Sequence, residues 1–199
     1  WGVCTRILYK KMGSILTFGS NGVAVAPGMV SARDLKLLYR ADRINDNTGI
    51  YGIVGNPVMH SLSPLIHNPG FHRINYNAVY VPFLSDSIRS FLTLAEMLRL
   101  RGFSVTVPFK VDVVRFLGNI TREVKQIGSC NTVVRVPNMW KGTNTDFYGF
   151  LNPIEKEIED GRITSALVLG AGGAAKAIVW ALKMRSVKVT ILNRTVSKA

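Results

Sequence analysis

The stretch Ser165-Ala-Leu-Val-Leu-Gly-Ala-Gly-Gly-Ala-Ala-Lys-Ala-Ile-Val-Trp-Ala-Leu182 decides how this chain folds. A short apolar run leads into glycines and then into apolar residues at helical spacing, which predicts a buried strand, a tight turn and an amphipathic helix. This is the opening of a dinucleotide-binding unit. Gly170, Gly172 and Ala175 occupy its three small-residue positions, which serve the bend, the approach to a pyrophosphate and the packing of helix on strand. The N–H groups at the helix start would face the phosphates.

The segment after this helix indicates which dinucleotide is bound. Lys188-Val-Thr-Ile-Leu192 is the expected second strand, and an NAD site usually has Asp or Glu near its end to bind the ribose 2′-hydroxyl. Here Asn193 stands in that place, followed by Arg194, Thr195 and Lys198. These residues suit a 2′-phosphate through charge-assisted hydrogen bonds. The sequence therefore predicts NADP; the alternative is a basic surface turn with no such role.

Composition excludes several classes of protein. The 199 residues are 47% hydrophobic and 19% charged, as in ordinary globular proteins. A net charge of +13 raises the possibility of nucleic-acid or anionic-membrane binding. The basic residues are spread along the chain, however, with no run interleaved with aromatics. We therefore expect no nucleic-acid partner and interpret the charge as attraction of an anionic substrate.

Metal, disulfide and membrane signals are weak. Cys4 and Cys130 are too few for a disulfide framework or a zinc site, and the three histidines lack neighbouring ligands, so we expect no metal. No signal peptide is visible, and the most apolar stretch, residues 166–184, is interrupted by glycines and Lys176. We expect no membrane span, and a reducing compartment such as the cytoplasm or the plastid stroma.

Upstream of the nucleotide unit, strand and helix patterns alternate, which predicts an open α/β sheet. Ser31 is expected to cap a short helix reaching Tyr39, and residues 41–49 to form a linker. One βαβ unit is not a complete doubly wound sheet, so we expect the chain to end inside its nucleotide domain. Strands are expected at residues 50–54, 78–82, 103–107, 132–136 and 140–143, and helices at residues 64–74, 86–100, 110–117 and 147–159.

Polar residues after the predicted strands form a candidate substrate site. Ser61 and Ser63 precede a proline-started helix, where hydroxyls and N–H groups can bind one anion, although Ser63 can also be read as an ordinary N-cap. Lys110 follows the strand end Ser104-Val-Thr106, and Asp146 follows small polar residues. Each is most often a surface residue when seen alone. Together they can form a proton-transfer pair beside a hydroxylated substrate.

These segments resemble shikimate dehydrogenase, in the order of that family, from about residue 50 to residue 199. The resemblance implies a substrate-binding α/β domain followed by an incomplete Rossmann NADP-binding domain. It also implies a reaction, the reversible NADPH-dependent reduction of 3-dehydroshikimate to shikimate in aromatic amino-acid and chorismate biosynthesis. The motifs are Gly55-x-Pro57-x-x-His60-Ser61-x-Ser63-Pro64-x-x-His67-Asn68, Ser104-Val-Thr106-x-Pro108-x-Lys110, Ile127-Gly128-x-x-Asn131-Thr132, Gly142-x-Asn144-Thr145-Asp146, Gly170-Ala-Gly-Gly-Ala-Ala175 and Asn193-Arg194-Thr195.

The same resemblance implies roles for the motif residues. Lys110 would be the catalytic acid/base, oriented and supported electrostatically by Asp146. Such a lysine can supply the proton that a carbonyl oxygen needs after hydride transfer. The residues implied to bind the substrate are Ser61 and Ser63, on its carboxylate, and Thr106, Asn131 and Asp146, on its ring hydroxyls. The residues implied to bind NADP are Gly170, Ala171, Gly172, Gly173, Ala174, Asn193, Arg194, Thr195 and Lys198.

The first residues carry a second resemblance, to the last strands of a type I 3-dehydroquinate dehydratase (β/α) barrel. Bifunctional proteins of plant type join the two enzymes in this order. Arg6 matches a substrate-carboxylate arginine, but Val25 and Met29 stand where that family has Ser and Gln, so we expect no dehydration by this segment. The segments that look like barrel strands are Thr5-Arg6-Ile7-Leu8, Leu16-Thr17-Phe18-Gly19 and Ala26-Pro27-Gly28.

The expected organisation has three parts: a barrel tail with its linker at residues 1–48, a substrate-binding domain at 49–150, and the start of the NADP-binding domain at 151–199. Two alternatives to shikimate dehydrogenase activity stay open. One is a quinate dehydrogenase-type activity. The other is a truncated, non-catalytic chain that binds substrate or nucleotide only. The expected partner is a small molecule, and the oligomeric state is left open.

Overall fold

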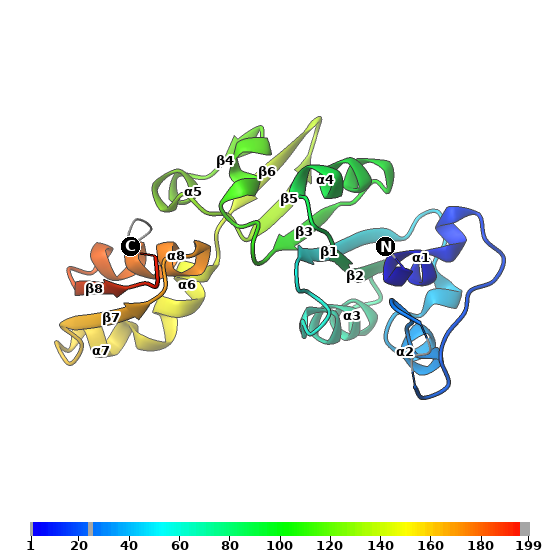
Figure 1. Ribbon diagram of the computed structural model, residues 1–199, viewed down its shortest axis with the longest axis horizontal. Coiled ribbons are helices and arrows are strands. Elements are labelled where there is room, and N and C mark those ends of the chain that lie inside the picture. The colour runs from blue at the N-terminus through cyan, green and yellow to red at the C-terminus, as the bar shows by residue number, and fades with distance from the viewer. Residues whose placement is uncertain (1, 24–25, 196–199) are drawn as a thin grey trace. The chain divides into compact units, whose positions relative to one another are not determined.

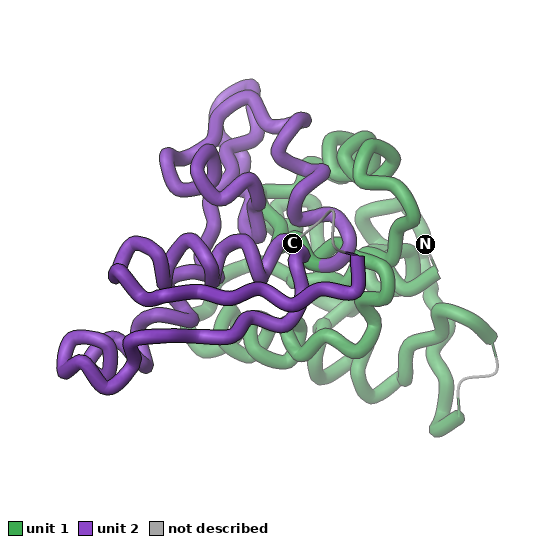
Figure 2. The backbone as a smooth tube through the Cα atoms, turned by 60° about the vertical axis from the view of Figure 1, so that its left-hand side comes forward, with its two compact units in different colours: residues 1–106 green, residues 107–199 purple. Residues whose placement is uncertain are grey.

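The structure is a computed structural model that describes residues 2–23 and 26–195. It divides into two compact units, residues 1–106 and residues 107–199, coloured separately in Figure 2. Each unit contains its own strands and packed helices. The division is one of backbone packing, and the functional boundaries expected at residues 48/49 and 150/151 stay predictions.

Three parallel strands form the centre of the first unit. β1 (Gly49–Gly55) lies between β2 (Ala78–Leu84) and β3 (Gly102–Val105), as the alternating pattern predicted. Helices α3 (Ser63–Arg73) and α4 (Ile88–Met97) connect the strands and lie on opposite sides of them (Figure 1). At Gly52 a Cβ atom would lie 2.2 Å from the Val81 carbonyl oxygen, so only glycine permits this spacing.

The first part of the second unit is a small mixed sheet. β5 (Thr132–Val136) and β6 (Met139–Thr143) form an antiparallel hairpin, and β4 (Asn119–Ile120) pairs with β6 in parallel. The hairpin turns at Asn138, which has φ +61°, a conformation that asparagine tolerates well. Helix α5 (Arg122–Ile127) is capped by the Thr121 hydroxyl and ends at Gly128, which has φ +70°. β5 has the predicted bounds, and β6 begins one residue before its predicted start. β4 was not predicted, because it is too short for a sequence pattern to reveal.

The nucleotide unit has the predicted order of elements, but its first strand is not buried as expected: Leu167 and Leu169 are 61% and 73% exposed. β7 (Ser165–Leu169), helix α8 (Gly173–Met184) and β8 (Lys188–Leu192) follow in order, and the two strands pair in parallel. Val168, Leu182 and Val187 form the buried centre of this unit, and Ala175 packs against it. The small side chain at position 175 therefore serves helix–strand packing, as its place in the glycine pattern indicated.

Two predicted helices differ from the structure. Residues 147–159 form α6 (Asp146–Leu151), a 3-10 turn at Asn152–Ile154 and α7 (Glu155–Glu159). Pro153 explains the break, because it lacks an N–H donor for a continuous α-helix. The helix predicted at 110–117 is a 3-10 helix at Asp112–Phe116. Within this unit α6 packs on α8 through Phe147 and Trp180, whose rings meet edge to face with centroids 5.0 Å apart.

The strands expected in the barrel-like segment were wrong. The segment forms helix α1 (Gly2–Ile7), a 3-10 turn at Tyr9–Met12, helix α2 (Ala32–Leu37) and a 3-10 turn at Ala41–Arg43. Within the described residues before Gly49, the one β-type pairing is the bridge between Ser20 and Ser31. A strand needs a neighbouring strand to bond its backbone groups. Here the backbone groups bond within a helical turn instead: the Leu8 N–H donates to the Cys4 carbonyl oxygen at 2.8 Å.

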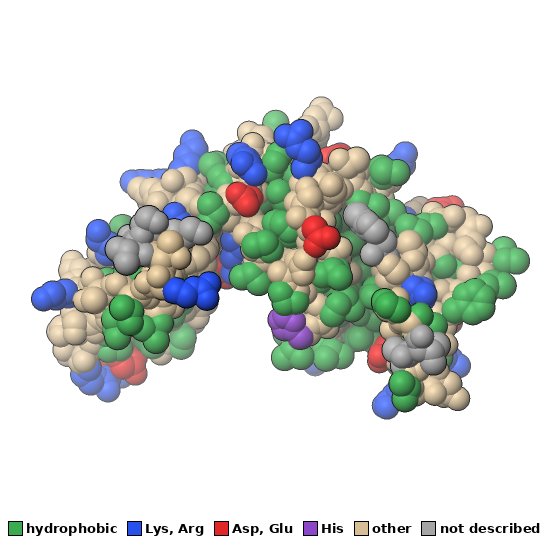
Figure 3. Space-filling view, in the orientation of Figure 1, with side chains coloured by type: hydrophobic (Ala, Val, Ile, Leu, Met, Phe, Trp, Pro, Cys, Tyr) green, Lys and Arg blue, Asp and Glu red, His purple; other side chains and the backbone are tan. Residues whose placement is uncertain are grey.

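Ser31 caps helix α2 as predicted, because its hydroxyl accepts a hydrogen bond from the Asp34 N–H at 2.9 Å. Arg6, expected on a strand, lies in α1 and donates to the Gly2 and Gly28 carbonyl oxygens at 2.8 and 3.2 Å. In the described parts of the chain, no helix combines the length and apolar character needed to cross a bilayer. On the face shown in Figure 3, the lysine and arginine side chains of the described residues stand in separate small groups.

Candidate active site

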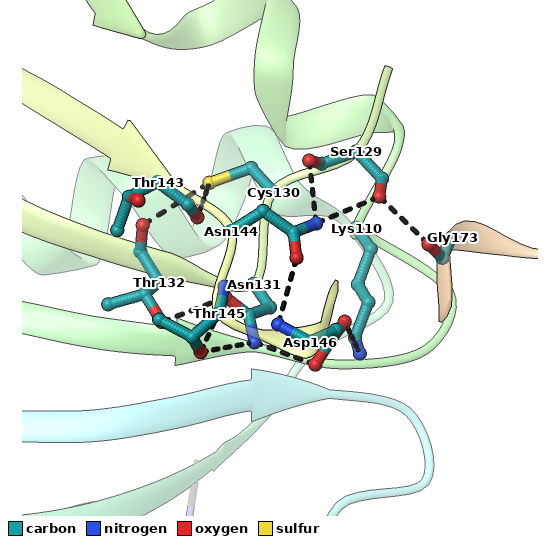
Figure 4. A network of polar contacts seen from close by, with 10 residues as sticks. All are labelled: Lys110, Ser129, Cys130, Asn131, Thr132, Thr143, Asn144, Thr145, Asp146 and Gly173. Carbon is teal, nitrogen blue, oxygen red and sulfur yellow. Dashed lines mark hydrogen bonds and ion pairs between the residues drawn. The ribbon is translucent and has the colours of Figure 1, made fainter. Parts of the chain in front are cut away.

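Lys110 and Asp146 meet in the second unit. The Lys110 ammonium donates to Asp146 Oδ2 at 2.6 Å, and the two side chains are 16% and 23% exposed (Figure 4). Lys110 lies just before the 3-10 helix, and Asp146 is the first residue of α6. The pair is shielded enough for a strong charge-assisted hydrogen bond and exposed enough to reach a bound molecule. The structure thus brings together the two residues that the sequence proposed as a proton-transfer pair.

Asn131 holds the other side of this carboxylate. Its amide nitrogen donates to Asp146 Oδ1 at 2.7 Å and to the Thr145 hydroxyl at 2.9 Å, and its oxygen accepts from the Thr145 N–H at 2.9 Å. Both carboxylate oxygens therefore have a donor, which fixes the orientation of the carboxylate. Asn131 stays partly accessible, so it can contact a ligand as well.

Two further polar residues join this network: Asn144 is hydrogen-bonded to the backbone of Asp146, and Ser129 is hydrogen-bonded to Asn144. Asn144 is 2% exposed; its amide nitrogen donates to the Ser129 carbonyl oxygen at 2.9 Å and to the Ser129 hydroxyl at 3.1 Å. Its oxygen accepts from the Asp146 N–H at 2.9 Å. Ser129 is fully buried and donates its hydroxyl to the Gly173 carbonyl oxygen at 2.8 Å. The sequence patterns assigned no role to these two residues, although Asn144 belongs to the motif that contains Asp146 and Ser129 lies two positions before Asn131.

Cys130 lies inside this network without being suited to nucleophilic chemistry. Its thiol donates to the Thr132 and Thr143 carbonyl oxygens at 3.3 and 3.2 Å. Burial raises its pKa to about 11, so the thiol stays protonated near neutral pH. Cys130 therefore connects the segment before β5 to the end of β6 as a small buried donor.

Hydroxyl groups gather in the first unit. The Ser61 and Ser63 hydroxyls lie 3.1 Å apart, and the Ser63 N–H donates to the Ser61 hydroxyl at 3.2 Å. Ser63 is the first residue of α3, and Leu62 holds the N-cap position without a side-chain bond. The alternative that Ser63 is an ordinary N-cap is therefore wrong, and its hydroxyl accepts a hydrogen bond from Ser61 instead.

Tyr80 and Ser104 contribute two further hydroxyl groups in this unit. The Tyr80 hydroxyl donates to the Ser104 hydroxyl at 2.8 Å, and burial raises the pKa of Tyr80, so it acts as a neutral donor. Thr106 follows β3 directly, and its N–H bonds to the Val54 carbonyl oxygen at the end of β1, at 3.0 Å. Parallel strands bring their carboxyl ends to one edge, where ligands of open α/β sheets bind. The structure places Thr106 at this edge in the first unit.

His67 stacks on the ring of Tyr80, with centroids 4.2 Å apart. The contact removes water from one face of the imidazole, and this partial burial of the ring lowers the pKa of His67, while the rest of the side chain stays exposed. The buried Asn68 side chain bonds both the N–H and the carbonyl oxygen of Tyr80, at 2.8 and 2.9 Å. Helix α3 is therefore anchored to β2 beside the serines.

The glycine turn has room for a ligand at two of its glycines. Gly170 has φ +107° and donates its N–H to the Leu192 carbonyl oxygen at 2.8 Å, which joins the turn to the end of β8. A Cβ at Gly170 or Gly172 would meet no atom within 4 Å. Ala171 is half-buried and Ala174 exposed beside them. The open space and the start of α8 are what a pyrophosphate needs, so these residues fit a dinucleotide.

Gly173 is small for a different reason from the one the sequence suggested. A Cβ there would lie 2.6 Å from the Lys110 Cβ. This glycine therefore permits close packing against Lys110. The glycine pattern alone gives no sign of such a contact.

The end of β8 carries no carboxylate. Asn193 is half-buried, and its side-chain amide donates to the Thr195 carbonyl oxygen at 2.7 Å. Arg194 and Thr195 are exposed and accessible to a ligand. Lys198, the fourth residue expected to bind the 2′-phosphate, lies outside the described residues. Among the described residues no group of three or more His, Cys, Asp or Glu side chains could hold a metal ion.

Two family models match the chain. The shikimate dehydrogenase substrate binding domain matches residues 53–133, and the type I 3-dehydroquinase model matches residues 1–46. A shikimate dehydrogenase (NADP(+)) from Caldanaerobacter subterraneus is 44% identical over 160 residues, which cover 79% of this chain and 57% of that protein. The chloroplastic bifunctional 3-dehydroquinate dehydratase/shikimate dehydrogenase of Arabidopsis thaliana is 37% identical over 215 residues, which cover all of this chain and 36% of that protein.

Solved structures agree with these matches. The shikimate dehydrogenase of Aquifex aeolicus has a TM-score of 0.72 and 38% identity, covering 78% of this chain and 59% of that one. The Thermus thermophilus shikimate 5-dehydrogenase in complex with NADP(H) and shikimate has a TM-score of 0.65 and 31% identity, covering 76% and 58%. The present chain thus spans little more than half the length of these dehydrogenases, and about a third of the Arabidopsis protein.

Proposed function

This chain belongs to the shikimate dehydrogenase family, and from this premise we propose that it is part of an enzyme that interconverts 3-dehydroshikimate and shikimate with NADP. One observation carries the proposal: Lys110 and Asp146 form a 2.6 Å pair with Asn131 on the second carboxylate oxygen. This is an arrangement that can hold and release a proton beside a hydroxylated ring.

The chemistry assigns the proton transfer to Lys110. When bound, NADPH supplies a hydride to the substrate carbonyl carbon. The carbonyl oxygen then carries negative charge, and the Lys110 ammonium donates a proton to it. The Asp146 carboxylate orients the ammonium before this step, and Asn131 keeps the carboxylate in place through its 2.7 Å hydrogen bond. In the oxidation direction the neutral Lys110 amine takes the proton from the substrate hydroxyl.

We assign recognition of the substrate to the hydroxyl groups at the carboxyl edge of the strands. Ser61 and Ser63 would bind the substrate carboxylate, because their hydroxyls lie 3.1 Å apart at the start of α3. Thr106, Asn131 and Asp146 would bind the ring hydroxyls. Each is half-buried and so offers polar atoms to a ligand.

The nucleotide turn supports NADP as cofactor. Gly170, Ala171, Gly172, Gly173 and Ala174 would receive the pyrophosphate at the start of α8, where partial positive charge favours it. The absence of a carboxylate at Asn193 favours a 2′-phosphate over a free ribose hydroxyl. We assign that phosphate to Asn193, Arg194, Thr195 and Lys198.

The barrel-like segment supports a bifunctional origin. Residues 1–46 match the dehydratase model, and the Arabidopsis relative is named for both activities. We propose the expected boundaries, with residues 1–48 derived from the dehydratase, 49–150 binding the substrate and 151–199 beginning the NADP domain. The compartment we propose is the cytoplasm or the plastid stroma, the second because the Arabidopsis relative is chloroplastic.

The decisive experiment follows NADPH absorbance at equal concentrations of shikimate and quinate. The proposal expects NADP+ reduction with shikimate and loss of this rate in Lys110→Ala. Faster reduction with quinate would indicate the quinate-type alternative. Binding of NADP+ and shikimate by calorimetry without turnover would indicate the non-catalytic alternative, and the absence of both binding and turnover would refute the proposal.

A further inference from the structure

Ser129 joins two sites that the proposed function treats separately. Its side chain is fully buried between the segment before β5 and the start of α8. The hydroxyl donates to the Gly173 carbonyl oxygen at 2.8 Å and accepts from the Asn144 amide at 3.1 Å (Figure 4). A buried hydroxyl that both donates and accepts is held in one orientation.

One end of this connection reaches the catalytic pair. Asn144, held by Ser129, accepts the Asp146 N–H at 2.9 Å, and Asp146 in turn binds the Lys110 ammonium at 2.6 Å. A displacement of Asn144 would therefore tilt the first residue of α6. Its carboxylate would then move relative to Lys110.

The other end reaches the nucleotide turn. Gly173 is the first residue of α8, directly after the glycines that leave space for a ligand. It also packs against Lys110: a Cβ at Gly173 would stand 2.6 Å from the Lys110 Cβ and 3.4 Å from the Ser129 Cβ. The start of α8 therefore packs against the aliphatic stem of Lys110, and the Ser129 hydroxyl bonds the Gly173 carbonyl oxygen.

We propose that Ser129 is a positioning residue: it fixes the position of the first turn of α8 relative to the Lys110–Asp146 pair. The inference rests on the proposed function, in which the nucleotide bound at this turn and Lys110 act on the same carbonyl group. Hydride and proton must arrive at adjacent atoms, and small displacements cost much of the rate. Ser129 contacts neither reactant and acts through Asn144 and Gly173.

Substitution by alanine separates this role from simple packing. In Ser129→Ala the Asn144 amide keeps its 2.9 Å bond to the backbone carbonyl of residue 129, so the fold is retained. What is lost is the hydroxyl that joins Asn144 to Gly173. Ser85→Ala is a matched control, because Ser85 is also a buried serine that donates to a backbone carbonyl, that of Ser87 at 2.9 Å, outside this network.

The first measurement is the steady-state kinetics of the protein, counted per NADP+-binding site. We expect Ser129→Ala to lower kcat about tenfold, with the KM for shikimate and the Kd of NADP+ changing less than about twofold, because positioning and not binding is affected. Ser85→Ala keeps all three values. If Ser129 only stabilises the fold, Ser129→Ala will lower the number of NADP+-binding sites and leave kcat per site unchanged. That result would overturn the inference.

The second measurement needs no turnover. NADP+ is added to the ¹⁵N-labelled chain, and the Asn144 side-chain amide and the Asp146 N–H are followed by NMR. We expect shifts of both signals that shrink at least twofold in Ser129→Ala; equal shifts in the two proteins would overturn the inference alone. Failure of the unsubstituted chain to bind NADP+ would overturn the proposed function, and this inference with it.

Discussion

The missing side chain of Gly173 lets the start of α8 pack against Lys110. At Gly173 an added Cβ would lie 2.6 Å from the Lys110 Cβ, closer than real side chains approach. Gly173 and Lys110 are 63 positions apart in the sequence, yet the space left by the glycine is filled by the lysine stem. Lys110 can therefore occupy its position only because residue 173, in the glycine pattern, has no side chain.

This contact predicts the effect of Gly173→Ala. The added methyl group must displace the Lys110 stem or the start of α8, at a cost of about 1–3 kcal/mol of the free energy of unfolding. We also expect a large loss of turnover, because Lys110 is displaced from Asp146. Urea unfolding followed by circular dichroism measures the first effect.

Gly149→Ala is the matched control for that substitution. Gly149 also lies in a helix, α6, but a Cβ there would meet no atom within 4 Å. Alanine is the better helix former, so we expect Gly149→Ala to stabilise the protein by about 0.5–1 kcal/mol. Equal destabilisation by both substitutions would contradict the contact between Gly173 and Lys110.

Lys110→Ala tests the assignment of the proton donor. We expect turnover to fall by a factor of about 10²–10⁴, the usual contribution of a positioned acid or base. NADP+ affinity should stay within about threefold, because the phosphates bind at the turn and not at the ammonium. Stopped-flow kinetics and fluorescence titration give the two values. Lys125→Ala, on the exposed face of α5, serves as control, and a loss of NADP+ binding in Lys110→Ala would refute the role assigned to the lysine.

Arg194→Ala tests the reading of the 2′-phosphate. The guanidinium is exposed just after β8, so its removal should weaken NADP+ binding about tenfold or more and leave NAD+ binding nearly unchanged. Calorimetric titration with both nucleotides measures the difference. Lys188→Ala removes an exposed cation from the other end of the same strand and should affect neither nucleotide. Equal weakening of the two nucleotides by Arg194→Ala would show that Arg194 does not contact the phosphate.

His67 predicts a pH dependence of stability. Its stacking on Tyr80 lowers its folded pKa below the usual 6.5, so the unfolded chain binds a proton at higher pH than the folded one. Stability is therefore complete above about pH 7 and falls as the pH drops through 6.5 towards the folded pKa. Thermal unfolding between pH 7.5 and 5.5 should show this decline, and His67→Gln should make it shallower.

His72 keeps part of this pH dependence in the variant, because burial and the charges of Arg40 and Arg43 lower its pKa as well. His60→Gln is the control, because the ring stacked on Tyr80 is that of His67 and not of His60. A slope unchanged by His67→Gln would show that the stacked ring is not responsible.

Local features of the sequence predicted much of the fold. The bounds of β5 and the extent of β1, β2 and β6 followed from apolar patterning, and the cap at Ser31 from the chemistry of its hydroxyl. Such features depend on near neighbours in the chain. The single helix expected at residues 147–159 is interrupted around Pro153, and proline is itself a local helix-breaking signal.

The barrel-like segment shows the opposite case. A family model matches residues 1–46, yet α1 occupies the place of an expected strand. A strand is stable only beside another strand, so residues that suit a strand take the conformation that satisfies their backbone within reach. The family model therefore identifies what this segment is similar to, whereas local hydrogen bonds determine that its first residues are helical.

By itself, the sequence determined the family and the strand–turn–helix–strand unit, because motifs and periodicity depend on residues close together in the chain. It also led to the proposal that Lys110 and Asp146 form a proton-transfer pair. Only the tertiary structure decided why Gly173 must be small, and that Ser129 and Asn144 support Asp146. These contacts join different segments of the chain: Ser129 bonds Asn144 and Gly173, and Gly173 packs against Lys110. Burial gives these contacts their effect on the structure. A buried hydroxyl must be paired, and a packed glycine leaves no space for a methyl group.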